Sequence, residues 1–197
     1  MHKGRIEAFS DGVLAIIITI MVLELKVPHG EATLATLLPA LPLFLSYALS
    51  FIYVGIYWNN HHHMFQATRN VSGGVLWANL HLLFWLSLIP FATGWMGENH
   101  FAPATTAVYG TILLFSAIAY VILQRSILKA PGGNPALQAA LGNDLKGKIS
   151  VVLYAAAIGL GFVSRWIACA IFVIVAMMWL IPDRRIERVV AAEPHAH

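Results

Sequence analysis

The chain has 197 residues, of which 59% are hydrophobic and 11% are charged, and its net charge is +3. Soluble domains carry about 25% charged residues, so this composition excludes an ordinary soluble fold and makes lipid the solvent for much of the surface. The basic residues lie scattered at the ends of apolar runs, which is a membrane-topology pattern and argues against nucleic-acid binding. The single Cys169 excludes a disulfide framework.

The first apolar segment covers residues 4–25, and it runs without a charged side chain from Gly12 to Leu23. Glu7 and Asp11 interrupt its approach, and no small-residue cleavage site follows it. A secretory signal peptide has neither of these features. We therefore expect an uncleaved first transmembrane helix.

Five further apolar segments follow along the chain, at residues 41–65, 75–96, 104–128, 149–163 and 166–181. Pro90 predicts a kink in the third segment because proline cannot donate a backbone hydrogen bond. The last two segments are shorter than the ~20 residues of a typical span. Gly159 and Gly161, close to Arg165, favour a tight turn between them over one long helix.

Charge distribution favours six spans over five. With six spans and a cytoplasmic N-terminus, only Lys26 and Arg165 among the twelve basic residues lie outside. Five spans would place the cluster at 184–188 outside, against the positive-inside bias. The sequence therefore predicts an all-α membrane protein with six transmembrane helices in residues 1–183 and both termini in the cytoplasm. Residues 184–197 are expected to form a disordered cytoplasmic tail.

A carboxylate at the mouth of a membrane helix is costly unless hydrogen-bond donors surround it. Six spans bring the end of the second segment and the start of the third to the depth of Asp11. Their aromatic, imidazole and amide side chains are suitable partners. These are Trp58, Asn60, His61 and His62 on the second segment, and Trp77, Asn79, His81 and Trp85 on the third.

These polar residues have two interpretations. The first is structural, because polar side chains in lipid bond across helices. The second is a metal site, which the spacing disfavours: neighbours in the run His61, His62 and His63 point in different directions on a helix. We predict no metal and no cofactor. The apolar helix that follows Asp11 is likewise either an ordinary membrane helix or a hydrophobic constriction that excludes water.

The segment R-I-E-A-F-S-D-G, with Arg5, Phe9, Ser10 and Asp11, resembles the R-x3-F-S-D signature of the transmembrane protein 175 family of endolysosomal potassium channels and its bacterial relatives. Trp58, His61 and His62 resemble the end of the family's second span. Asn79 and Pro90 lie in a segment that resembles its third span. The resemblance covers the first three spans well and the last three by length and hydropathy.

The resemblance implies a six-helix unit that assembles as a homotetramer, with the first helix of each subunit lining the pore. It implies that Arg5, Ser10 and Asp11 hold this helix against the second and third. It also implies an apolar constriction that begins five residues after the aspartate. In this sequence the constriction residues are Ile16, Thr19, Ile20 and Leu23.

The leading hypothesis is therefore a weakly selective potassium-permeable leak channel, multi-pass in a bacterial plasma membrane, with potassium ions and lipid as partners and no enzymatic activity. One alternative is a proton pathway or proton-coupled transporter that uses His61, His62, His81, Asp11 and Glu7 as relay groups. The other is a metal-dependent membrane enzyme or metal carrier built on the histidines. Neither alternative accounts for the unbroken apolar first helix.

Overall fold

The computed structural model describes residues 3–29, 33–66, 68, 70–130 and 144–180, and every regular element in these ranges is a helix. The predicted all-α class is confirmed. In chain order the elements are α1 (Lys3–Leu23), η1 (Leu34–Ala40), α2 (Leu41–Gln66), α3 (Gly73–Ser87), α4 (Ile89–Glu98), α5 (Pro103–Leu128), α7 (Leu145–Leu160) and α8 (Arg165–Leu180). The expected tail at 184–197 lies outside the described residues.

The third apolar segment is divided into two helices. α3 ends at Ser87, and Pro90 occupies the first turn of α4, where a missing backbone N–H breaks no helical hydrogen bond. Together α3 and α4 form a rod from Gly73 to Glu98. Four helical stretches are long and apolar enough to cross a membrane: α1, η1 with α2, α3 with α4, and α5.

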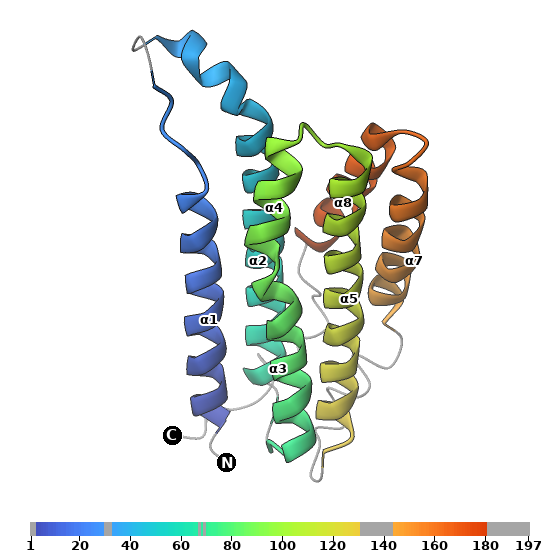
Figure 1. Cartoon of the computed structure of the whole chain (residues 1–197). Coiled ribbons are helices and arrows are strands. Elements are labelled where there is room, and N and C mark those ends of the chain that lie inside the picture. The colour runs from blue at the N-terminus through green and yellow to red at the C-terminus, as the bar shows by residue number, and fades with distance from the viewer. Residues whose placement is uncertain (1–2, 30–32, 67, 69, 131–143, 181–197) are drawn as a thin grey trace.

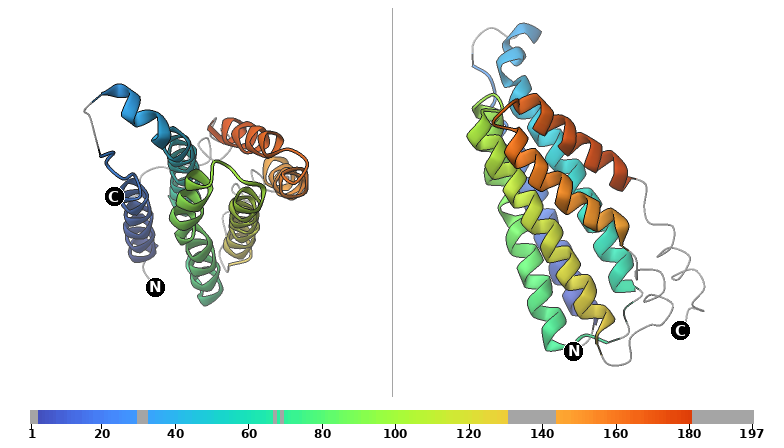
Figure 2. Two further views of the ribbon diagram at one scale, coloured as in Figure 1. Left: turned by 45° about the horizontal axis from the view of Figure 1, so that its top comes forward. Right: turned by 90° about the vertical axis from the view of Figure 1, so that its right-hand side faces the viewer.

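α7 and α8 are separate helices of 16 residues each, joined at residues 161–164. α7 begins at Leu145, ahead of the apolar run, because the Asp144 side chain accepts a hydrogen bond from the backbone N–H of Gly147 at 2.8 Å. Carboxylates are favoured helix caps, and this one extends the helix into the polar loop. Figure 2 shows this pair running along the outer side of α2 and α5.

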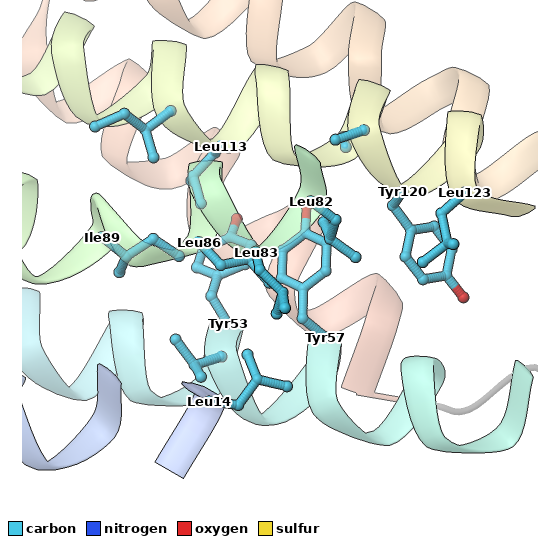
Figure 3. Packing of buried hydrophobic residues seen from close by; sticks show 14 of the residues in the cluster. Leu14, Tyr53, Tyr57, Leu82, Leu83, Leu86, Ile89, Leu113, Tyr120 and Leu123 are labelled. Atoms are coloured by element: carbon cyan, nitrogen blue, oxygen red, sulfur yellow. The ribbon is translucent and has the colours of Figure 1, made fainter. Parts of the chain in front are cut away.

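The helices form a bundle with α1 at one edge and the α7–α8 pair at the other (Figure 1). α2, α3, α4 and α5 make the centre, and buried leucine and tyrosine side chains fill the space between them (Figure 3). Gly97 lets α4 approach α2 closely, since a Cβ there would lie 2.6 Å from Leu43 Cα. Small residues at such crossings are typical of membrane bundles, where close packing replaces the hydrophobic effect.

Candidate functional site

α1 has two faces that differ in what covers them. One face packs into the bundle and is buried at Ile6, Ser10, Leu14, Ile17 and Met21. The opposite face carries Ile16, Ile20 and Leu23, whose exposed fractions are 57%, 42% and 79%. Thr19 is also exposed, and its hydroxyl donates to the Ile16 carbonyl of its own helix at 2.9 Å. The four residues expected at the constriction thus share the face that the subunit leaves open.

A groove separates part of this open face from α4. Its volume is about 550 Å³, and Ile16, Ile20 and Phe91 contribute apolar walls. Glu24 and Glu98 lie at one end of it. Beside that end, Lys26 Nζ bonds to Glu98 Oε1 at 2.7 Å and ties the chain after α1 to the end of α4.

A chain of buried hydrogen bonds joins α1 to α3 and α2. Asn79 Nδ2 donates to Ser10 Oγ at 2.9 Å, and Ser10 Oγ donates to the Ile6 carbonyl at 2.8 Å. Asn79 Oδ1 lies 2.8 Å from His61 Nε2, which donates when that nitrogen carries the hydrogen. The three side chains are almost fully buried. We call Ser10, Asn79 and His61 the buried polar chain; it fixes the height and rotation of α1 against its neighbours.

Asp11 has a different partner and a wetter setting. Trp58 Nε1 donates to Asp11 Oδ1 at 3.0 Å, and Trp58 is exposed. The Trp58 ring stacks on His62 with 5.9 Å between centroids, and His62 Nε2 lies 2.8 Å from Gln66 Nε2. Asp11 is therefore held by one indole of α2 at the edge of the subunit.

The other residues of the sequence-predicted network lie apart. Trp77 is 75% exposed. His81 accepts from Trp85 Nε1 at 3.0 Å, and Trp85 stacks on Phe115 of α5. Within the described residues no hydrogen bond joins Trp77 or His81 to α1. Only the Asn79 side of α3 faces Ser10.

At the N-terminal end of α1, Arg5 and Phe9 are exposed, and Arg5 makes no hydrogen bond or ion pair within the described part of the chain. The contact there comes from Lys3, which the sequence analysis missed. Lys3 Nζ donates to the carbonyls of Gln66 at 3.0 Å and Phe65 at 3.4 Å. The free carbonyls at the C-terminal end of a helix attract a cation. A lysine at the start of α1 was therefore the feature of the sequence that could have predicted this contact with the end of α2.

The described residues contain no group of three histidine, cysteine or acidic side chains placed to hold a metal ion. His63 takes no part in the contacts with α1; its ring lies 5.8 Å from that of His62. His195 and His197 lie outside the described residues. The site on α1 thus consists of an open apolar face, a buried polar chain behind it and a tryptophan–aspartate contact at one end.

Residues 5–90, which include Ser10, Asp11, Trp58, His61 and Asn79, match the family model of the endosomal/lysosomal potassium channel TMEM175. The chain is 57% identical over 188 residues to a potassium channel of Chryseobacterium sp. (strain P1-3), covering 95% of this chain and 97% of that protein. The chain belongs to the TMEM175 family.

The fold of this TMEM175 family member agrees with a solved relative. The crystal structure of a lysosomal potassium-selective channel TMEM175 homolog from Chamaesiphon minutus matches with a TM-score of 0.81 and 29% identity, covering 92% of this chain and 97% of that one. The human endosomal/lysosomal proton channel TMEM175 is 33% identical over 103 residues, which are 47% of this chain and 20% of the human protein. The expected family and membrane-channel fold are confirmed.

Proposed function

We propose that this protein is a potassium-permeable, weakly selective cation leak channel. The observation that carries the proposal is the open apolar face of α1, where Ile16, Ile20 and Leu23 are exposed while the opposite face is packed. We propose that other subunits, rather than lipid, cover this face. The bacterial relatives named potassium channels support potassium as the ion.

The pore requires several subunits, because one helix cannot enclose a path. We propose a homotetramer with α1 of each subunit around a central axis and the open face turned inward. Closed cyclic symmetry is the usual arrangement of such assemblies. Four copies of Ile16, Ile20 and Leu23 then form three apolar rings, spaced along the axis by about 6 Å and about 4.5 Å at 1.5 Å per residue.

Such rings gate by excluding water, since they offer no polar atom to replace an ion's hydration shell. A slight widening admits a partly hydrated cation. Potassium holds its water less tightly than sodium, which gives a modest preference without a cage of carbonyls. Thr19, between the rings on the same side of α1, supplies the nearest hydroxyl for a hydrated ion.

Asp11 and the buried polar chain act as a scaffold in this proposal. Ser10 accepts a hydrogen bond from Asn79, and Asp11 accepts one from Trp58. These contacts hold the N-terminal half of α1, and they thereby position the apolar residues that follow it. We propose both termini in the cytoplasm, a location in the bacterial plasma membrane and no enzymatic activity. The basic residues near the helix ends support this orientation.

The deciding experiment is a reversal-potential measurement on purified protein in liposomes. With a potassium gradient opposed by a sodium gradient, we expect a reversal potential displaced modestly toward the potassium equilibrium potential. A reversal potential equal to the chloride equilibrium potential would refute cation conduction. The absence of current from well-folded protein would refute it as well.

Proton conduction is the second candidate, favoured because vertebrate relatives are named proton channels. His61 supports it, since a titratable ring lies in the buried polar chain next to Ser10 and Asn79. A pH gradient imposed on the same liposomes distinguishes the two. Flux that saturates and depends steeply on pH, with no dependence on potassium, would favour the proton pathway.

A further inference from the structure

The C-terminal end of α5 extends beyond the start of α7. Two pairs of neighbours align these helices: Val121 and Gly147 line the same small cavity, and a Cβ on Gly110 would lie 3.1 Å from Ile158 Cγ1. The helices therefore run antiparallel. At 1.5 Å per residue, α5 continues for about 7.5 Å past the first residue of α7. Figure 1 shows this offset between the two helix ends.

The short length of α7 places its first turn at the edge of the apolar layer. α7 has 16 residues, or about 24 Å at 1.5 Å per residue. The hydrocarbon core of a bilayer is about 30 Å thick. A bilayer thins locally around a short helix, which brings lipid headgroups to its end. Lys146 and Lys148 lie in this first turn, so their ammonium groups meet those headgroups.

The two lysines point to opposite sides of α7, which packs against both α5 and α8. Lys146 lies over the Trp179 ring of α8, with Nζ 5.8 Å from the ring centroid. Two residues along a helix turn the side chain by about 200°, so the exposed Lys148 points away from α8 and lies on the α5 side of α7.

Arg125 lies on the matching side of α5. It comes one helical turn after Val121, which meets α7 at the small cavity, and its side chain is exposed. Arg125 and Lys148 therefore flank the outer groove between the two helices, at the point where α7 begins. We call this groove, with Arg125 and Lys148 at its end, the α5–α7 seam.

The positive charge of the seam is not neutralised by the described residues. Arg125 and Lys148 make no ion pair or side-chain hydrogen bond there, and neither does Lys129 at the end of α5. Asp144 is the carboxylate at the start of α7. Its Oδ1 accepts from the backbone N–H of Gly147 at 2.8 Å, and its Oδ2 is buried. An anion from outside the described residues is therefore needed to pair the two cations.

Apolar side chains continue the seam toward the middle of the membrane. Val152 comes one turn after Lys148 on α7 and is 66% exposed, and Ile122 comes just before Arg125 on α5 and is 40% exposed. A surface with two cations at its end and apolar side chains beyond them is complementary to a phosphate that carries an acyl chain. A free phosphate would use only the cations.

We propose that the α5–α7 seam binds an anionic phospholipid, with its phosphate between the Arg125 guanidinium and the Lys148 ammonium and an acyl chain along Ile122 and Val152. Arginine pairs with phosphate through two parallel hydrogen bonds. Basic sites between transmembrane helices bind anionic headgroups in this way. The lipid then bridges α5 and α7 and ties the α7–α8 pair to the bundle. The proposal rests on the placement of the helices in the membrane and not on the pore assigned to α1.

The first test is native mass spectrometry of the purified protein titrated with phosphatidylglycerol or with phosphatidylcholine. The wild type should bind phosphatidylglycerol more tightly. A basic side chain near an anionic lipid surface contributes about fivefold in affinity, so Arg125→Gln with Lys148→Gln should weaken the binding by about 25-fold. Unchanged affinity in this double variant would overturn the proposal.

The matched control is Lys26→Gln with Arg165→Gln, which removes two positive charges at the other end of the bundle. Lys26 bonds to Glu98 and Arg165 bonds to the His100 carbonyl, so both lie near the turn between α4 and α5. The control should keep the wild-type affinity for phosphatidylglycerol. Equal weakening in the two double variants would show a general attraction to positive charge and would overturn a site at the seam.

The second test distinguishes the lipid from free phosphate. Millimolar inorganic phosphate, added at constant ionic strength, should not displace phosphatidylglycerol, because it makes no contact with Ile122 or Val152. Displacement would overturn the docking of a lipid and leave a phosphate site.

Thermal unfolding gives an independent measurement, since a ligand that binds the folded state stabilises it. Phosphatidylglycerol should raise the melting temperature of the wild type and of the control by similar amounts, and that of Arg125→Gln with Lys148→Gln by less. An equal rise in all three proteins would overturn the proposal.

Discussion

At the scale of single residues, the contrast between Ile16 and Ile17 is the most useful one in the chain. They are adjacent and identical, yet Ile16 is exposed and Ile17 is buried against the bundle. Successive helical residues point about 100° apart, which is enough to separate an open face from a packed one. The pair therefore offers a matched test of the proposed pore face.

Replacing Ile16 with Asn should wet the apolar ring, raise the current and bring the potassium-to-sodium permeability ratio toward one. The same change at Ile17 should destabilise the subunit by about 2–5 kcal/mol, since it removes a buried apolar side chain. Liposome currents and melting temperatures measure the two effects. A changed permeability ratio in Ile17→Asn, with Ile16→Asn unaltered, would assign the pore to the other face.

The buried polar chain gives a second prediction at this scale. Asn79→Leu leaves His61 Nε2 buried without its partner, and leaves Ser10 Oγ with only its bond to the Ile6 carbonyl of its own helix. A buried group without a partner costs about 1–3 kcal/mol, so we expect a clear loss of thermal stability in detergent. Asn59→Leu, at a partly exposed position of α2, is the control. Equal melting temperatures for the two variants would show that the chain does not hold α1 in place.

At the scale of elements, α1 is fixed near both ends but by different chemistry. The buried polar chain holds the first half, and the exposed pair of Lys26 and Glu98 holds the chain beyond Leu23 to the end of α4. Exposed ion pairs are weak and screened by salt. Added salt therefore weakens the contact between Lys26 and Glu98 more readily than it weakens the buried polar chain.

The Lys26–Glu98 pair predicts an alkaline limit. The hydrogen bond from Lys26 to Glu98, with the charge of that carboxylate, raises the pKa of Lys26 above its ordinary value of 10.5. A raised lysine pKa stabilises the folded state fully below the ordinary value, and the contribution is lost as pH rises through the raised one. The melting-temperature difference between wild type and Lys26→Gln should therefore persist to pH 10 and vanish at more alkaline pH. A difference that disappears between pH 8 and 10 would contradict this assignment.

At the scale of the whole molecule, the proposed tetramer brings the open face of α1 together and leaves the α7–α8 pair at the periphery. In a Cys169→Ser background, Leu23→Cys should therefore crosslink subunits with a short thiol-reactive linker. Val152→Cys, on the exposed side of α7, should not. Light scattering in mild detergent should give the mass of four subunits. Monomers alone, at concentrations where conduction persists, would contradict the assembly.

Composition and pattern in the sequence determined the membrane class, the all-α fold and the family. An uncharged apolar run of this length is typical of a helix in lipid, because a helix pairs its own backbone groups. The motif at Arg5, Phe9, Ser10 and Asp11 is local, so no knowledge of packing was needed to read it. The division at Pro90 also followed from one residue's missing N–H. The early start of α7 did not, because it depends on how the Asp144 side chain closes on Gly147.

Tertiary structure decided which polar groups meet and which face of α1 stays open. α1 is apolar all round beyond Asp11, so its sequence has no polar stripe to mark a face; only the neighbouring helices distinguish Ile17 from Ile16. Likewise Trp77, Asn79 and His81 are equally plausible partners by type and depth, and the rotation of α3 brings Asn79 alone to Ser10. Helix rotation is set by packing across the bundle, which a pattern within one segment does not contain.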